Sequence, residues 1–208
     1  MLRTTHFIVV VAASSVFVES ASIFSAFGRG FEHQEEIQYV GTSSSQGGGL
    51  VEKTVPSKMW VCTKQPPAGD PESSQLTVFL RLFDYLDGKN SREERLPMGV
   101  PVSISAEGTK ASRNLTACFF LPEKVQANPP TPTNPEVSLV SRPSLTIITK
   151  SFGGYANSEE TWDAETDKLR KLVTASGLSF DPNVVYWNAY DPPLKFWGRR
   201  NEVWLVRV

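Results

Sequence analysis

Histidine, cysteine and methionine are scarce in this chain of 208 residues, which holds two, two and three of them. The histidines are His6 and His33, so none occurs beyond position 33. The sequence also lacks HExxH and CxxC zinc motifs, a phosphate-binding loop and a GxSxG nucleophile motif. Acid–base catalysis beyond position 33 would therefore need Asp, Glu or Lys with a shifted pKa, and we expect that the protein is not an enzyme.

Long apolar runs and an excess of one charge are missing as well. The chain has 21 basic and 22 acidic residues with no basic stripe, so we expect no nucleic-acid partner. The apolar run at positions 7–18 is 12 residues long, which is too short for a comfortable membrane span. A basic start precedes the run, and the small residue Ser20 follows shortly after it. This arrangement is typical of a signal peptide at residues 1–20 with cleavage before Ala21. A retained anchor is the alternative to a secreted protein.

Secretion changes the interpretation of the two cysteines. Cys62 and Cys118 each lie in a strand-like run, and an even pair in an oxidising compartment predicts a disulfide. The alternative is a pair of buried free thiols. Asn114-Leu115-Thr116 is a glycosylation sequon, so we also expect a glycan on Asn114.

The chain divides into a tail and one regular domain. The Ser- and Gly-rich composition near Ser43–Gly49 predicts that residues 21–50 form a flexible N-terminal tail. Residues 51–208 carry a β-α-β-β order twice, in halves at about 51–127 and 136–208, joined by a proline-rich segment. This order predicts an α+β fold, with a curved, mostly antiparallel sheet or distorted barrel and two helices packed on it.

The expected elements follow local signals. The first half has a strand at 58–64, a helix that begins at Asp70-Pro71-Glu72 and ends at Gly88, and strands at 95–106 and 115–121. The second half has a strand at 145–152, a helix capped by Asn157 and ended by Gly177, and strands at 184–190 and 202–208.

The first helix is apolar on two faces. At helical spacing one stripe consists of Leu76, Phe79, Leu80, Phe83 and Leu86, and the other of Val78, Leu82 and Tyr85. One stripe must pack on the sheet. The other is covered by the tail or a loop, or it is a surface for a ligand or partner, with Arg81 at its edge for an anionic group.

Several motifs in order along the chain resemble the SOUL haem-binding family. They are Leu96-Pro97-Met98-Gly99-Val100-Pro101-Val102, Phe120-Leu121-Pro122, Asn128-Pro129-Pro130-Thr131-Pro132, Phe152-Gly153-Gly154-Tyr155-Ala156, and Tyr190-Asp191-Pro192-Pro193 followed by Gly198-Arg199-Arg200-Asn201-Glu202. The resemblance covers about residues 51–208 and implies the same distorted barrel with two helices.

The resemblance also implies a function. It suggests a non-catalytic carrier or scavenger that binds haem or another tetrapyrrole in an apolar groove beside the first helix. Val78, Leu82 and Tyr85 would form the groove wall, and Arg81 would pair with a propionate. We expect the protein to be a monomer. We also expect no fixed axial histidine on the haem iron, because His33 lies in the tail. The alternative is a protein-interaction module that uses the same apolar face and has no physiological cofactor.

The arginines before the last strand have two interpretations. Arg199 and Arg200 either brace a turn through carboxylates and backbone carbonyls, or offer cations at the groove mouth. The first use is commoner, and we expect it here.

Overall fold

The computed structural model describes residues 34–44, 49–66, 75–192 and 195–208. The expected signal peptide, His33 and the expected helix start at Asp70 lie outside these residues. The unit from Glu35 to Val208 contains all of the described helices and strands.

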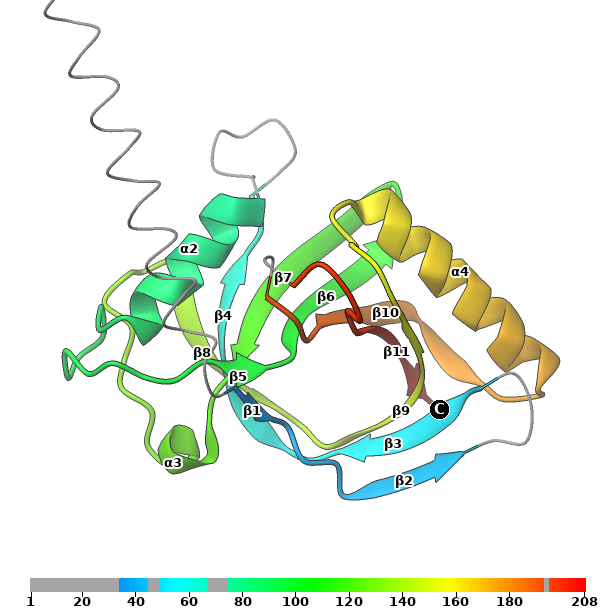
Figure 1. Ribbon diagram of the computed structural model, residues 1–208, viewed down its shortest axis with the longest axis horizontal. Helices are drawn as coiled ribbons and strands as arrows, with labels where there is room; N and C mark the ends of the chain where they lie inside the picture. The colour runs from blue at the N-terminus through cyan, green and yellow to red at the C-terminus, as the bar shows by residue number, and fades with distance from the viewer. Residues whose placement is uncertain (1–33, 45–48, 67–74, 193–194) are drawn as a thin grey trace, which may run out of the picture. The chain divides into compact units, whose positions relative to one another are not determined.

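Nine strands form one antiparallel sheet that curves into an open barrel (Figure 1). They are β2 (Gly41–Ser44), β3 (Val51–Val55), β4 (Lys58–Lys64), β6 (Val102–Thr109), β7 (Ser112–Phe120), β8 (Val137–Arg142), β9 (Leu145–Phe152), β10 (Phe180–Ala189) and β11 (Asn201–Arg207). Their order across the sheet is β2-β3-β9-β11-β10-β6-β7-β4-β8. A short parallel pair, β1 (Glu35–Glu36) with β5 (Gly99–Val100), lies apart from this sheet.

Both expected β-α-β-β halves are present. The first is β4, α2 (Gln75–Leu86), β6 and β7, and the second is β9, α4 (Glu159–Ala175), β10 and β11. The halves meet where β6 pairs with β10, and each places its three strands in the same order outward from that junction. The predicted α+β class with two helices on an antiparallel sheet is confirmed, and a one-turn helix, α3 (Glu123–Gln126), is added to it.

The helix ends follow the expected signals with one shift. Gly88 and Gly177 both have positive φ after their helices, at 109° and 69°, where a side chain would be strained. The N-cap of α4 is Ser158 rather than Asn157, and its hydroxyl accepts from the backbone N–H of Thr161.

The N-terminal segment belongs to the fold, in contrast to the expected tail. Residues 35–44 provide β1 and β2, and β2 pairs with β3 along its whole length. Ile37 is buried in the barrel, and the backbone N–H of Val40 donates to Thr54 O. The small polar residues of this segment are typical of a linker in composition. Backbone pairing of β2 with β3 and the burial of Ile37 nevertheless make residues 35–44 part of the fold.

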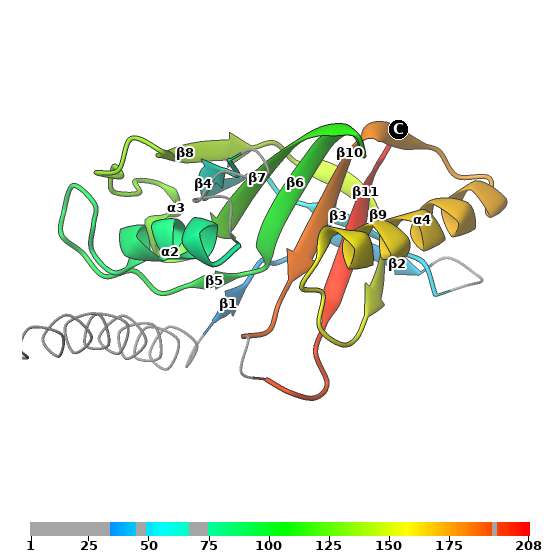
Figure 2. The same cartoon turned by 90° about the horizontal axis from the view of Figure 1, so that it is seen from above.

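The core has an outer and an inner layer, set by the alternation of side chains along each strand. On β11, Val203 and Leu205 pack outward with Trp162 and Leu169 of α4. Trp204, one position away, points into the barrel. Figure 2 shows the two long helices α2 and α4 on one side of the sheet, toward opposite ends of it.

The expected disulfide joins Cys62 and Cys118 inside the barrel. The two residues are directly opposite in β4 and β7, and both side chains are about 1% exposed. The bridge therefore ties neighbouring strands of the first half together at the level of the inner core.

Candidate functional site

The predicted groove wall on α2 is part of the core. Val78, Leu82 and Tyr85 are only 3%, 0% and 1% exposed. The Tyr85 hydroxyl donates to Pro130 O at 2.9 Å. This face of α2 is turned toward β4 and β7, so the apolar surface that α2 leaves partly exposed is its other stripe.

Arg81 lies beside the buried face and reaches back to the sheet. Its Nη1 donates to the Thr63 hydroxyl at 3.3 Å, and the buried Thr63 hydroxyl donates to Glu136 O at 2.8 Å. With 100° per residue, Arg81 projects roughly opposite Phe83 on the far flank of α2. The structure therefore brings the four predicted residues together, but it turns their side of the helix inward.

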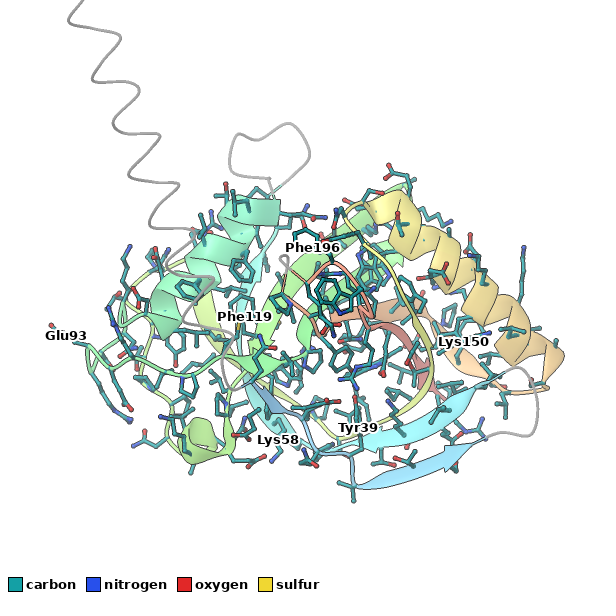
Figure 3. The ribbon with its side chains drawn as sticks, viewed as in Figure 1. Tyr39, Lys58, Glu93, Phe119, Lys150 and Phe196 are labelled. Atoms are coloured by element: carbon teal, nitrogen blue, oxygen red, sulfur yellow. A yellow bond between two sulfur atoms is a disulfide. The ribbon has the colours of Figure 1, made fainter. Side chains whose placement is uncertain are left out.

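The remaining apolar side chains of α2 form a partly exposed strip, which we call the outer stripe: Leu76, Phe79, Leu80 and Phe83. Leu76 is 47% exposed and the other three are half-buried. The Phe79 and Phe83 rings stack with centroids 6.1 Å apart, and Phe79 also packs on Phe119 of β7 at 5.1 Å. Figure 3 labels Phe119. The outer stripe is thus a partly exposed apolar surface, and Phe79 joins it to the sheet.

Aromatic and cationic side chains cross the interior of the barrel. A continuous series of ring–ring and cation–ring contacts, each between 4.4 and 6.4 Å, crosses it in the order Trp60, Arg142, Tyr186, Trp204, Tyr39 and Lys53. Trp60 and Trp204 are 1% and 2% exposed.

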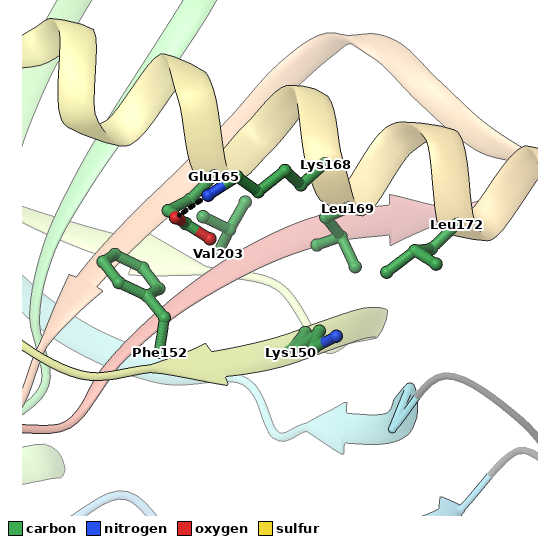
Figure 4. A pocket seen from close by; sticks show the side chains of 7 residues that line it. All are labelled: Lys150, Phe152, Glu165, Lys168, Leu169, Leu172 and Val203. Atoms are coloured by element: carbon green, nitrogen blue, oxygen red, sulfur yellow. Dashed lines mark hydrogen bonds and ion pairs between the residues drawn. The ribbon is translucent and has the colours of Figure 1, made fainter.

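A small pocket lies between α4 and the outer surface of the sheet (Figure 4). Its volume is about 50 Å³, and Lys150, Phe152, Glu165, Lys168, Leu169, Leu172 and Val203 line it. Sites for drug-sized ligands have volumes of roughly 300–1,000 Å³. This pocket is therefore too small for a tetrapyrrole.

A buried carboxylate, Glu202, accepts hydrogen bonds from several side chains in the barrel interior. Glu202 is 2% exposed and accepts from Trp204 Nε1 at 2.9 Å, Tyr190 Oη at 3.0 Å and Lys53 Nζ at 3.1 Å. Burial alone would raise the pKa of Glu202, but these hydrogen bonds and the charge of Lys53 outweigh it and lower the pKa below its ordinary value. Burial and the Glu202 charge raise the pKa of Tyr190 well above its ordinary value, so Tyr190 stays a donor.

We expect Glu202→Gln to lower the free energy of unfolding at pH 7 by about 3 kcal/mol, because it leaves Lys53 without its buried partner. The lowered pKa means that the charge stabilises the fold above about pH 4.5 and that this stabilisation disappears as pH falls through the folded pKa. Urea unfolding at pH 7 and near pH 3 measures both effects.

Glu52→Gln is the matched control, because Glu52 pairs with Arg207 at a site where both side chains are about one-third exposed. It should cost less than about 1 kcal/mol. Equal losses for the two variants, or a Glu202→Gln loss that is unchanged at low pH, would contradict the assigned role of Glu202.

The β10–β11 loop carries two exposed aromatic side chains, Phe196 at 70% and Trp197 at 78%. It extends from the end of the barrel that faces the viewer in Figure 1, and Figure 3 labels Phe196. Neither residue was singled out from the sequence, because a short loop has no periodicity that separates exposed from buried aromatics.

The arginines of this loop brace it. Arg199 donates to the backbone carbonyls of Asp191 and Lys195 and lies over the Tyr155 ring at 4.4 Å. Arg200 pairs with Glu36 at 2.7 Å and lies over the Tyr190 ring at 3.7 Å. Both arginines therefore hold this turn in place through backbone carbonyls and a carboxylate, as expected from the sequence.

Metal ligation has no obvious site in the part of the chain that the structure describes. Within it, no group of three or more His, Cys, Asp or Glu side chains could hold a metal ion. Both cysteines are in the disulfide, and Met98 is 2% exposed. Over the same residues, no helix combines the length and apolar character needed to cross a bilayer.

Comparison with known proteins gives a family. The model of the family described as SOUL heme-binding protein matches residues 34–206. Heme-binding protein 1 of Xenopus tropicalis is 32% identical over 186 residues, which cover 88% of this chain and 95% of the relative. Heme-binding protein 1 of mouse is 34% identical over 131 residues, 62% of this chain and 68% of the relative, and human heme-binding protein 2 is 30% identical over 151 residues, 71% and 73%.

Solved structures with low sequence identity to this chain share its fold, and the likeness is limited to the fold. The C-terminal domain of EcmrR has a TM-score of 0.51 at 11% identity and covers 76% of this chain and 95% of its own. A protein described as a hydrolase from Listeria innocua has a TM-score of 0.51 at 10% identity, with 86% and 95% covered. The shared two-helix, antiparallel architecture and the extent of the sequence match lead to one conclusion: the chain belongs to the SOUL heme-binding protein family.

Proposed function

We propose that this protein is a secreted, non-catalytic carrier or scavenger that binds haem or another tetrapyrrole on the outer stripe of α2. The observation that carries the proposal is the outer stripe itself, a partly exposed aromatic and aliphatic surface on a member of this family. An external site is also supported by the aromatic and cationic side chains that cross the barrel interior.

The binding mode follows from the side chains available. Flat apolar contact with Leu76, Leu80 and Phe83 would supply most of the affinity. The described residues contain no histidine, and the cysteine sulfurs are oxidised to a disulfide. Iron, when present, would be weakly held or open to solvent, and iron-free porphyrin would bind with similar affinity.

A hemin titration followed at the Soret band tests the proposal. We expect a saturable one-to-one shift for the natural protein and binding at least about tenfold weaker for Leu76→Asp, because a charge replaces an apolar contact. Val40→Asp is the matched control, since Val40 is a 73% exposed apolar residue away from α2. It should leave the titration unchanged.

Two results would overturn the placement. Non-saturable binding of hemin would contradict the tetrapyrrole-binding function. An unchanged hemin affinity in folded Leu76→Asp would contradict the outer stripe as the binding site.

The second candidate function is a protein-interaction module, and Phe196 and Trp197 favour it. Adjacent aromatics that are 70% and 78% exposed are the residue type that dominates binding energy in protein interfaces. Absence of a saturable hemin shift would make this function the better explanation.

Secretion and glycosylation also remain part of the proposal. Asn114 is exposed on β7, near the hairpin that joins β6 to β7, so a glycan there would extend into solvent. The disulfide supports an oxidising compartment.

A further inference from the structure

Arg142 has an unusual environment for an arginine, because it reaches into the barrel. It lies at the end of β8 opposite Lys58 of β4, on the same face as Trp60. Its guanidinium carbon is 4.4 Å from the Trp60 ring centroid and 5.0 Å from that of Tyr186. Its Nη1 donates to the hydroxyl of Ser103, which is fully buried, at 2.9 Å.

No carboxylate of the described residues pairs with Arg142. The ion pairs of those residues do not include it, and its single hydrogen bond goes to a neutral hydroxyl. Among the described residues its Nε and Nη2 make no hydrogen bond, and neither nitrogen is among the completely buried unpartnered atoms. Removal from water lowers the pKa of Arg142 to about 10, which leaves it charged at neutral pH.

The nearby charges leave this cation uncompensated. Glu107 is close enough to act on it through space but makes no ion pair with it. Lys58, opposite Arg142 in the sheet, is paired with Glu123 (Figure 3 labels Lys58). A desolvated cation without an acid is costly, and such groups are normally paired.

A second unpaired polar group lies in the same part of the barrel. Asn188 of β10 is directly opposite Ser103 of β6 and is fully buried. Its Oδ1 has no hydrogen-bond partner among the described residues, although its Nδ2 donates to backbone carbonyls. Buried polar groups normally have partners, so this acceptor marks a place for an ordered water that donates to it.

We propose that Arg142 is the anchor of a binding site for a small oxyanion, a carboxylate or phosphate, at the mouth of the barrel between Trp60 and Tyr186. The Nε and Nη2 groups, which make no hydrogen bond among the described residues, form the donor fork that pairs with two oxygens of such a group. The two rings wall the site, and the Ser103 hydroxyl fixes the guanidinium. This site lies inside the barrel wall and does not depend on tetrapyrrole binding at α2.

The test is a titration of the natural protein with sodium acetate and, separately, inorganic phosphate, at constant ionic strength set with chloride. The Arg142 Nε–Hε NMR signal, assigned by its loss in Arg142→Met, should shift saturably with one of the oxyanions. Arg95 is the internal control, because its side chain is 71% exposed and paired with Asp87. Its signal should follow ionic conditions only.

Binding by the fork also predicts a variant effect. Arg142→Lys keeps the charge but loses the fork, so the oxyanion affinity measured by calorimetry should fall at least about tenfold. The anion that saturates, acetate or phosphate, identifies the class of ligand. A shift with chloride that equals the shift with the oxyanions, or no saturable shift with either oxyanion, would overturn the site. These outcomes are measured on the natural protein and so do not depend on the folding of either variant.

Discussion

Replacing Leu82 by aspartate is expected to prevent folding. Leu82 is fully buried beneath α2, and removal of a leucine side chain from such a position costs about 2–5 kcal/mol. The new carboxylate adds a burial penalty of several kcal/mol more. The sum is comparable with the entire stability of an ordinary domain, roughly 5–15 kcal/mol. Circular dichroism and urea unfolding should find little or no native protein.

The matched variant is Leu76→Asp, which lies on the outer stripe of the same helix and is 47% exposed. It should fold and lose only about 0.5 kcal/mol, because surface substitutions away from special contacts have small effects. The pair separates the buried face of α2 from its outer stripe. If Leu82→Asp were as stable as Leu76→Asp, the assignment of the two faces would be reversed.

Loss of the disulfide is the second large effect. The double variant Cys62→Ser, Cys118→Ser should lower the free energy of unfolding by about 4 kcal/mol, because the bridge closes a loop with a sequence separation of 56 in the unfolded chain. Both hydroxyls would also replace sulfur in a buried, largely apolar cluster. Chemical denaturation of the purified variant measures the change.

Reduction of the natural protein provides an independent control. Unfolding in the presence of a strong reductant should reproduce the loss seen in the double variant, since both remove the same constraint. A variant that unfolds at the same denaturant concentration as the oxidised protein would show that the bridge adds nothing to stability.

Local patterns predicted the elements of the fold well. The bounds of β4 and β9 match the expected strands at 58–64 and 145–152, because runs of apolar and β-branched residues bounded by breakers define them. Gly88 and Gly177 marked helix ends for a reason that acts within a few residues. The β-α-β-β order then followed from these local signals.

The face of α2 could not be predicted in the same way. Both of its stripes are apolar, so periodicity does not say which one meets the sheet. The choice depends on contacts from distant parts of the chain, such as the hydrogen bond from Tyr85 to Pro130 in the 128–132 loop. The resemblance led us to assign Val78, Leu82 and Tyr85 to a ligand, whereas packing makes them core.

Buried charges were hidden for a related reason. Glu202 and Arg142 look like ordinary surface residues at strand ends in the sequence. Their environment arises from pairing across the sheet, with Lys53 and Tyr190 around one and Trp60 and Tyr186 around the other. Such contacts depend on strand register, which composition and spacing do not encode.

The measurement that tests the central claim most directly is NMR mapping of iron-free protoporphyrin on the isotope-labelled protein. Iron-free ligand avoids paramagnetic broadening and removes any contribution from metal ligation. Saturable shifts confined to the exposed side of α2, at Leu76, Phe79, Leu80 and Phe83, are the predicted result. Shifts that cluster elsewhere, or none that saturate, would contradict a tetrapyrrole site on this helix.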